Sequence, residues 1–362
     1  MNPKPIRLLV VDDSALARRL TTDSLAPFPE IEIVGTAQDA YAARDKILQL
    51  KPDVMTLDIE MPRMDGVTFL KAVMKHHPMP VIILSSLTSA TSDKPWEALQ
   101  AGAVEVVEKP AGGVSARAHG LHLAELIKAA AGARLRPAPP EAALPQTRQL
   151  HPPRTFSERG IILMGSSTGG TEALKTVLTS MRGDLPGVCI VQHIPPLFSK
   201  TFAERMNKLC AMEVREARDR DVVQPGLALV APGGYHMLLQ WQGRHYQVHL
   251  NQGPPIHHQR PAVDILFDSA VNAGAAPHAA AALLTGMGTD GAAGLLRLRN
   301  EGAATIAQNE ETCVVFGMPR EAIRQGAAQH VVPLERIGPL LDQLISNPSA
   351  MTRKGAAADP AL

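Results

Sequence analysis

Short runs of aliphatic and β-branched residues recur along the first 130 residues, and each is followed by a stretch in which apolar residues have helical spacing. Short apolar runs bounded by polar residues are typical of buried strands. Strands that alternate with helices predict a doubly wound, mainly parallel α/β sheet, with functional groups beyond the carboxyl ends of the strands. The apolar runs cover residues 6–11, 31–36, 53–58, 80–86 and 103–109.

A second alternation of the same kind begins near residue 160. Residues 237–252 interrupt it with two strand-like stretches on either side of Gln242 and Gly243, which is the pattern of a β-hairpin. The second half of the chain therefore predicts another mainly parallel α/β domain, with a hairpin insertion. Its apolar runs cover residues 160–165, 187–193, 227–232, 281–288 and 304–309.

The composition changes sharply between these two halves. Residues 131–157 are rich in Pro, Ala, Arg and Gln and contain almost no residue that a core could use. Pro-rich linkers are extended and semi-stiff. We therefore predict a first domain over residues 1–130, a linker over 131–157, a second domain over 158–347 and a disordered tail over 348–362.

Length, charge and cysteine content narrow the class of protein. The 362 residues exceed the usual size of one domain, in agreement with two cores. Lys plus Arg number 36 and Asp plus Glu number 35, so the overall charge does not favour nucleic acid or a membrane surface as a partner. No apolar stretch approaches the roughly 18 residues of a membrane span, and the three cysteines have no metal or redox spacing. These features predict a cytoplasmic protein that binds no nucleic acid and is not inserted into a membrane.

Acidic residues follow two of the predicted strands in the first half. Asp12 and Asp13 come directly after the first strand, and Asp58 ends the third. Because the carboxyl ends of parallel strands meet at one edge, the three carboxylates would repel one another unless a hard cation such as Mg²⁺ binds them. Helix capping is the alternative for a single aspartate. It does not explain why Ser85 and Lys109 stand at strand ends of their own.

The stretches VVDDS, LDIEMPRMDG, ILSS and EKP resemble the receiver domain of two-component response regulators, which has a flavodoxin-like fold. The resemblance implies that Asp58 accepts a phosphoryl group from a histidine kinase and that Ser85 and Lys109 engage this group. The chain departs from many receivers at Val106, where a switching aromatic residue is common. The implied Mg²⁺ ligands are Asp12, Asp13, Asp58 and the backbone carbonyl of Glu60.

The stretch GSSTGG, residues 165–170, lacks the lysine of a phosphate-binding loop and the glycine spacing of a dinucleotide fingerprint. It fits the G-x-S-x-G elbow, in which glycines permit a tight turn between strand and helix and lift the central hydroxyl, here that of Ser167. A serine nucleophile needs a general base and an orienting carboxylate. His193 and Asp290 each follow another apolar run, so they can supply these roles at the same sheet edge.

Each of these three residues also has an ordinary structural explanation. The glycine-rich turn could simply reverse the chain, His193 could end a strand, and Asp290 could cap the helix that follows it. Their joint occurrence at three strand ends favours a catalytic triad. The chain order Ser, His, Asp differs from the order Ser, Asp, His of α/β-hydrolases and disfavours that fold.

Residues 158–347 resemble the catalytic domain of the chemotaxis protein-glutamate methylesterases, through GSSTGGTEAL, VQHIPP, APGGYH, RPAVDILFDSA, LTGMGTDGA and AQNEETCVVFGMPREAI. The resemblance implies a Rossmann-like domain without a cofactor, with Ser167 rather than Ser166 as the nucleophile. It also implies an oxyanion hole of backbone amides near Ser167 and near Met287, assisted by Thr168. The implied function is phosphorylation-activated hydrolysis of glutamate methyl esters in chemoreceptors, together with deamidation of receptor glutamines.

Some features allow more than one interpretation. Four histidines at positions 245, 249, 257 and 258 lie close in sequence but lack the usual ligand spacing of a zinc site. Arg260 suits either contact with substrate or an ion pair. The rival to an esterase is a response regulator whose second domain binds DNA or only docks, although no basic helical module suits DNA. For an esterase, the domain order predicts that the unphosphorylated first domain covers the active-site edge of the second.

Overall fold

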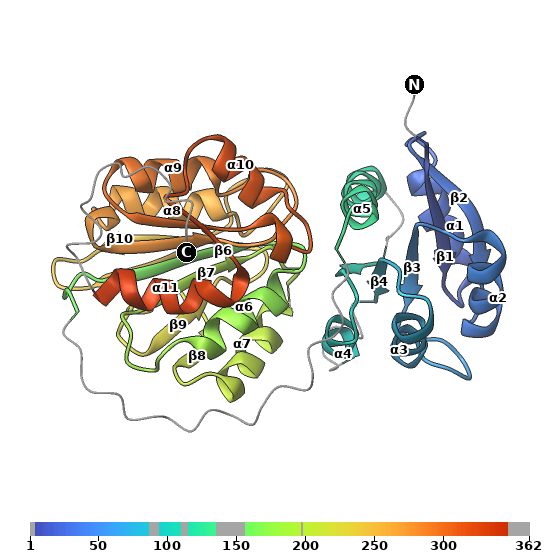
Figure 1. The fold of residues 1–362 in the computed structure, drawn as a ribbon, viewed down its shortest axis with the longest axis horizontal. Coiled ribbons are helices and arrows are strands. Elements are labelled where there is room, and N and C mark those ends of the chain that lie inside the picture. The colour runs from blue at the N-terminus through green and yellow to red at the C-terminus, as the bar shows by residue number, and fades with distance from the viewer. Residues whose placement is uncertain (1–3, 87–93, 110–114, 135–155, 197, 347–362) are drawn as a thin grey trace. The chain divides into compact units, whose positions relative to one another are not determined.

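The computed structural model describes residues 4–86, 94–109, 115–134, 156–196 and 198–346. The chain divides into two compact units, Met1–Ala142 and Ala143–Leu362 (Figure 1). Most of the predicted linker and all of the predicted tail lie outside the described residues. Their exact boundaries therefore stay predictions.

The first unit contains one parallel five-stranded sheet with the strand order β2-β1-β3-β4-β5. β3 and β4 are buried along their whole length, as expected for parallel strands that are covered on both faces. The predicted strands and the flavodoxin-like fold of this unit are confirmed. The strands are β1 (Ile6–Val11), β2 (Ile31–Ala37), β3 (Val54–Asp58), β4 (Val81–Ser85) and β5 (Glu105–Glu108).

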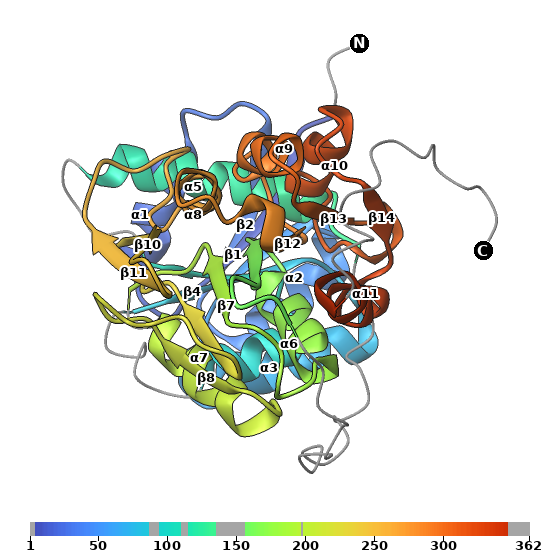
Figure 2. The same cartoon turned by 90° about the vertical axis from the view of Figure 1, so that its left-hand side faces the viewer.

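Helices cover both faces of this sheet (Figure 2). They are α1 (Ala15–Leu25), α2 (Ala40–Leu50), α3 (Gly66–His76), α4 (Lys94–Gln100) and α5 (Ser115–Ala131). α1 packs against α5, and α3 packs against α4. Ser14, Asp39 and Asp65 cap α1, α2 and α3, because each side chain accepts a hydrogen bond from an amide of the first turn. These caps fix where the loops after β1, β2 and β3 end.

The second unit contains a parallel seven-stranded sheet with the strand order β14-β13-β12-β6-β7-β9-β8. The five predicted strands are present, but the run over residues 281–288 was predicted too long, because β12 ends at Leu283, before a glycine-rich loop. The short strands β8 and β14 were not predicted. The strands are β6 (Ile161–Ser166), β7 (Val188–Gln192), β8 (Glu213–Glu216), β9 (Leu227–Val230), β12 (Ala279–Leu283), β13 (Ala304–Gln308) and β14 (His330–Val332).

The predicted hairpin is present as a separate two-stranded antiparallel sheet. It consists of β10 (His236–Trp241) and β11 (Tyr246–Asn251), and Gly243 in the connecting turn has a φ of +81°. A glycine adopts this left-handed conformation without the strain that a side chain would cause. β10 packs against helix α8 (Val263–Asn272), which begins near the end of the hairpin segment.

Helices cover both faces of the seven-stranded sheet as well (Figure 1). α8, α9 and α10 lie on one face, and α6, α7 and α11 lie on the other. No helix in the described ranges is long and apolar enough to span a bilayer. Besides α8, the helices are α6 (Gly170–Ser180), α7 (Phe198–Leu209), α9 (Ala292–Asn300), α10 (Met318–Arg324) and α11 (Leu334–Ser346).

Candidate catalytic and phosphoacceptor sites

The first site lies at the carboxyl end of the sheet in the first unit. Asp12 follows β1 and Asp58 ends β3, and their exposed fractions are only 1% and 2%. Lys109 follows β5, and its Nζ lies 2.9 Å from Oδ2 of Asp12 and 2.9 Å from Oδ2 of Asp58. The structure thus brings together three residues that the sequence places at separate strand ends.

Burial changes the acidity of the Asp58 carboxyl group. Loss of hydration raises the pKa of Asp58 to about 6; the hydrogen bond with Lys109 opposes this increase, and the nearby charge of Asp12 adds to it. Burial alone would lower the pKa of Lys109, but its hydrogen bonds with Asp58 and Asp12 raise it. Asp58 therefore ionises at a higher pH than an exposed aspartate, beside a lysine that stays charged.

Asp13 completes a group of three carboxylates at this edge. One oxygen from each of Asp12, Asp13 and Asp58 lies within 4.8 Å of the others. Lys109 pairs with only two of these three carboxylates among the described ion pairs, so negative charge remains that a cation would balance. Asp13 is exposed, so water can fill the other coordination positions, as Mg²⁺ prefers. The donor set therefore fits Mg²⁺.

The other predicted residues of this site lie at the next strand end and in the loop after β3. Ser85 ends β4 and is 1% exposed, and its hydroxyl lies 3.3 Å from the carbonyl oxygen of Ser86. The amide of Glu60 donates to Oδ1 of Asp58 over 3.2 Å, which turns the loop across the carboxylate. Val106 is buried in β5. An aliphatic side chain thus occupies the position where an aromatic switch is common.

The second site lies at the carboxyl ends of β6, β7 and β12. Ser166 pairs with Gln192 in the ladder between β6 and β7. Ser167 and His193 are therefore the next residues on two adjacent strands, and their backbones leave the sheet side by side. The amide of His193 donates to the carbonyl oxygen of Ser166 over 3.0 Å and holds this arrangement.

Asp290 lies in the loop after β12 and binds His193. Nε2 of His193 is 2.7 Å from Oδ2 of Asp290, and both side chains are buried. Burial alone would raise the pKa of Asp290, but the hydrogen bond and charge of His193 and two backbone amides lower it. Because an ionised carboxylate can only accept, Nε2 of His193 carries the proton in the neutral ring, and Nδ1 is the basic nitrogen.

Two backbone amides hold the Asp290 carboxylate. Val263 donates to Oδ2 over 2.7 Å, and Asp264 donates to Oδ1 over 2.9 Å. Both amides belong to the first turn of α8, whose own N-cap residue, Ala262, has no capping side chain. A carboxylate is favourable there because helix N-termini carry unpaired N–H groups. Asp290 therefore caps α8 rather than α9, the helix that follows it in the sequence.

The turn that carries Ser167 has the expected elbow form. Gly169 has a φ of +73°, and a Cβ atom at this position would lie 2.6 Å from Cβ of Val314, so only glycine fits. The amide of Ser167 donates to the carbonyl oxygen of Thr285 over 3.0 Å. α6 begins directly afterwards at Gly170. Strand, tight turn and helix thus follow one another as GSSTGG predicts.

Two groups near Ser167 have unused hydrogen-bonding capacity. Thr168 is 1% exposed, and its Oγ1 is buried without a hydrogen-bond partner among the described residues. Gly286 lies directly behind Ser167, since a Cβ atom on it would lie 2.7 Å from Cβ of Ser167. The next amide, that of Met287, donates no hydrogen bond within the described ranges. Both groups are therefore available as donors.

Ser166 is engaged elsewhere and is fully buried. Its Oγ donates to Oε1 of Gln192 over 2.6 Å. Nε2 of Gln192 in turn donates to the carbonyl oxygens of Ser167, over 2.9 Å, and of His193, over 3.0 Å. The strand pattern assigns no role to Gln192. The available signal was a polar residue at the end of an otherwise apolar strand.

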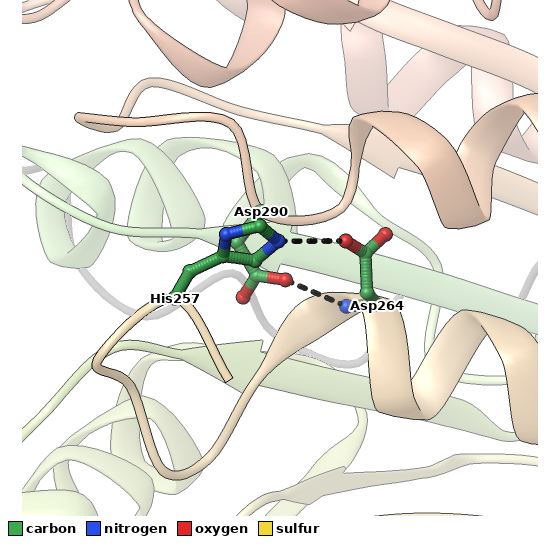
Figure 3. A group of neighbouring side chains, drawn as sticks. All are labelled: His257, Asp264 and Asp290. Atoms are coloured by element: carbon green, nitrogen blue, oxygen red, sulfur yellow. Dashed lines mark hydrogen bonds and ion pairs between the residues drawn. The ribbon is translucent and has the colours of Figure 1, made fainter. Parts of the chain in front are cut away.

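A second carboxylate, that of Asp264, lies beside Asp290. Figure 3 shows the imidazole of His257 directed at the Asp264 carboxylate. Oδ2 of Asp264 is 3.5 Å from Nε2 of His257, and Oδ1 accepts from the amide of Gly294 over 2.7 Å. Burial and the charge of Asp290 raise the pKa of Asp264. The three side chains could offer ligands to a metal ion, but Asp290 already accepts three hydrogen bonds. The imidazole of His257 instead pairs with the carboxylate of Asp264, so we assign no metal here.

Two further residues whose roles the sequence left open, His249 and Arg260, have local partners. His249 pairs with Asp219 over 3.0 Å and belongs to no metal-binding cluster in the described part of the chain. Arg260 donates to the carbonyl oxygens of Gln252, over 3.1 Å, and Gly253, over 2.9 Å. Its guanidinium group therefore holds a loop, and it forms no ion pair with a carboxylate among the described residues.

Comparison with known proteins matches both units to described families. The sequence model of the CheB methylesterase family matches residues 162–341, and that of the response regulator receiver domain matches residues 8–117. The chain resembles the crystal structure of the Thermotoga maritima CheB methylesterase catalytic domain, with a TM-score of 0.50 and 37% identity, over 51% of this chain and 98% of that one. The Rossmann-like interpretation of the second unit is consistent with this match.

Relatives of known name match almost the whole chain. A protein-glutamate methylesterase/protein-glutamine glutaminase from Syntrophus aciditrophicus is 51% identical over 333 residues, which cover 92% of this chain and 97% of the relative. Another from Pseudomonas aeruginosa is 49% identical over 347 residues, or 94% of this chain and 97% of the relative. These matches do not favour the DNA-binding or docking alternative. The chain belongs to the family of protein-glutamate methylesterases/protein-glutamine glutaminases that carry a receiver domain.

Proposed function

We propose that the chain hydrolyses methyl esters of glutamate side chains in chemoreceptors and releases methanol. The names of the relatives support the chemical class of substrate. The observation that carries the proposal is the buried hydrogen bond between His193 and Asp290 beside the strand end from which Ser167 projects. A neutral imidazole with an oriented carboxylate can activate a serine hydroxyl for acyl transfer.

In the proposed reaction, Oγ of Ser167 attacks the ester carbonyl carbon while its proton passes to Nδ1 of His193. The bond to the methoxy oxygen then breaks, this oxygen takes the proton from His193, and methanol leaves an acyl-serine. Water attacks the acyl-serine and gives a proton to the same nitrogen, which returns it to Oγ as glutamate is released. Asp290 stabilises the imidazolium group that forms in each half of the cycle.

The same cycle can act on a receptor glutamine. The leaving group is then ammonia, and the product is again glutamate. An amide nitrogen must be protonated before it leaves, so this activity depends more strongly on the proton held by His193. We therefore include deamidation in the proposed function, as the second half of the relatives' name suggests.

Thr168 and the backbone amide of Met287 are the proposed oxyanion donors. Their support is that Oγ1 of Thr168 is buried without a partner, and that the Met287 amide donates to no other described residue. A buried donor of this kind is costly unless the substrate oxygen binds to it. Loss of one such donor typically costs about 3 kcal/mol of transition-state stabilisation.

In the first unit we propose Asp58 as the residue that accepts a phosphoryl group from a histidine kinase. Bound Mg²⁺ would balance the charge of the phosphoryl oxygens and the carboxylates as they approach. Lys109 and Ser85 would then contact the phosphoryl oxygens. The proposed Mg²⁺ ligands are Asp12, Asp13, Asp58 and the carbonyl oxygen of Glu60, of which the three carboxylates already lie close together.

We propose that phosphorylation of Asp58 activates the esterase in the cytoplasm by ending an inhibition exerted by the receiver unit. Phosphorylation replaces the single charge of the carboxylate with about two charges on the phosphoryl oxygens, so the buried site gains about one negative charge, which can bias a two-state contact between domains. The support is the presence of both units in one chain.

Methanol release from methylated receptor in membranes tests the proposal, with and without a small acyl phosphate as phosphodonor. We expect the phosphodonor and Mg²⁺ to raise the rate of the wild-type chain and to leave the rate of Asp58→Asn unchanged. Ser167→Ala serves as the blank. Equal rates for the wild-type chain with and without the phosphodonor would exclude inhibition by the receiver unit.

A further inference from the structure

We propose that Gln192 is a positioning residue that fixes the nucleophile and the base relative to each other. This inference rests on the proposed function, because it gives Gln192 a part in the same reaction. Gln192 is 1% exposed and touches the backbones of both Ser167 and His193 through one amide group. It contacts neither Oγ of Ser167 nor the imidazole in the described hydrogen bonds.

The chemistry of its neighbours settles which way the Gln192 amide points. Carbonyl oxygens only accept hydrogen bonds, so the NH₂ group must face the carbonyls of Ser167 and His193. Oε1 then faces Ser166, whose hydroxyl donates to it over 2.6 Å. All three hydrogen bonds of the amide are therefore mutually consistent, and the side chain has one orientation.

Two residues of GSSTGG that the reaction leaves unexplained serve this arrangement. Ser166 holds Oε1 of Gln192, as described above. Gly170 makes room for the same oxygen, because a Cβ atom on Gly170 would lie 2.2 Å from Oε1. The helix α6 can therefore start directly beside the glutamine only with glycine at this position.

The hydrogen bonds of Gln192 affect the distance between the nucleophile, Ser167, and the base, His193. Ser167 and His193 stand on adjacent strands, and the ladder between β6 and β7 ends one residue before them. The Gln192 amide continues the connection beyond that end, since it binds the carbonyl oxygens of both residues. Proton transfer and attack depend steeply on such distances, and small misplacements can lower rates by about 100-fold.

The test compares Gln192→Met, which has a similar length but no amide, with the full-length wild-type chain in the methanol assay. We expect kcat to fall about 10-fold to 100-fold and KM to stay within about twofold, because substrate contacts are unchanged. Thr305→Val is the matched control. It removes a fully buried hydroxyl on β13 that makes two hydrogen bonds to backbone groups of the loop before β14. We expect this control to lose stability but to keep kcat.

Ser166→Ala provides a second variant in case Gln192→Met does not fold. It leaves both backbone carbonyls satisfied and frees only Oε1, so we expect a smaller fall in kcat of about threefold to tenfold. If both variants match Thr305→Val in kcat, the positioning role is wrong.

Labelling with a serine-reactive fluorophosphonate separates this inference from the proposed function. The probe reports the nucleophilicity of Ser167 without requiring a methyl ester. We expect Gln192→Met and Ser166→Ala to label more slowly than wild type and Thr305→Val. If the wild-type chain labels at Ser167 but releases no methanol, the proposed substrate is wrong. The labelling rates of the variants then still decide the inference on Gln192. Labelling of Gln192→Met and Ser166→Ala at the wild-type rate, or a wild-type chain that does not label, would overturn the inference.

Discussion

Nε2 of His193 donates to Oδ2 of Asp290 over 2.7 Å, and the same oxygen accepts the amide of Val263 over 2.7 Å. One carboxylate thus orients the imidazole and caps α8. The loop that carries Asp290 is thereby tied both to the reacting group and to the helix on the other side of the site. Catalysis and local stability should respond together when this carboxylate changes.

We expect Asp290→Asn to lower kcat by about 10³-fold to 10⁴-fold, because an amide can no longer hold the required tautomer of His193 or balance its charge. The free energy of unfolding should also fall by about 1–3 kcal/mol, since the side-chain NH₂ group faces donors that carboxylate oxygens now satisfy. The measurements are methanol release and urea unfolding. The control is Asp268→Asn on helix α8, at a half-exposed ion pair with Arg297. It should change neither kcat nor the free energy of unfolding strongly.

Thr168→Val should lower activity without lowering stability, unlike Asp290→Asn. The hydroxyl of Thr168 is buried without a partner among the described residues, so its replacement by a methyl group should leave the unfolding free energy unchanged or raise it by about 1 kcal/mol. If the hydroxyl stabilises the oxyanion, kcat should nevertheless fall about 10-fold or more. Steady-state kinetics and thermal unfolding of one preparation decide this. An unchanged kcat would remove Thr168 from the oxyanion hole.

The sequence was sufficient for most of the fold because parallel strands that are covered on both faces appear as uninterrupted apolar runs. Strands that are buried along their whole length, such as β3, β4, β6, β7 and β12, follow this rule most closely. The edge strands β2 and β5 are interrupted by polar residues but keep enough apolar residues to be detected. β8 and β14 do not. β8 has the sequence EVRE and β14 has only three residues, so neither contains an apolar run long enough to detect. They form because a neighbouring strand offers unpaired backbone groups, which is information from the tertiary structure.

The site residues were predictable where chemistry and strand ends coincide, as at Asp58 or His193. Gln192 and the capping of α8 by Asp290 were not. Gln192 acts through hydrogen bonds to backbone carbonyls. Every residue type has such a carbonyl, so the sequence gives no signal for these partners. Asp290 caps a helix that begins 27 residues earlier in the chain, as the separation from Val263 shows. Local spacing cannot reveal such a pair.

Asp58→Asn should stabilise the receiver unit at high pH in the absence of Mg²⁺. The pKa of Asp58 is raised to about 6 in the folded chain, whereas unfolded aspartate has a pKa of about 4. Between these values the folded state binds more protons, so the free energy of unfolding falls as pH rises and stays reduced above pH 6. Removal of the ionisable group should therefore raise stability at pH 8 by about 1–3 kcal/mol.

Urea unfolding followed by Trp96 fluorescence measures this effect, with Trp241→Phe as the background because the chain has two tryptophans. Trp96 is buried in α4 and reports on the first unit. Asp23→Asn, on the exposed side of α1, is the control and should behave like its parent. An Asp58→Asn chain less stable than its parent at pH 8 would show that the buried charge is compensated.

Mg²⁺ should be required for phosphorylation of Asp58 by a small acyl phosphate, and EDTA should abolish it. Asp13→Asn should weaken Mg²⁺ binding about 10-fold or more because one of three carboxylates is lost, while the exposed position leaves folding intact. Isothermal titration with Mg²⁺ and intact-mass detection of the phosphorylated chain provide the two readouts. Unaltered Mg²⁺ affinity in Asp13→Asn would remove this residue from the metal site.

Methanol release from methylated receptor by Ser167→Ala and Ser166→Ala, side by side with wild type, tests the central claim most directly. The two serines are neighbours, but only Ser167 lies beside His193 at the open end of its strand, whereas Ser166 is fully buried against Gln192. The account predicts no methanol above background from Ser167→Ala and clear, reduced release from Ser166→Ala. Release by Ser167→Ala at the wild-type rate would contradict it.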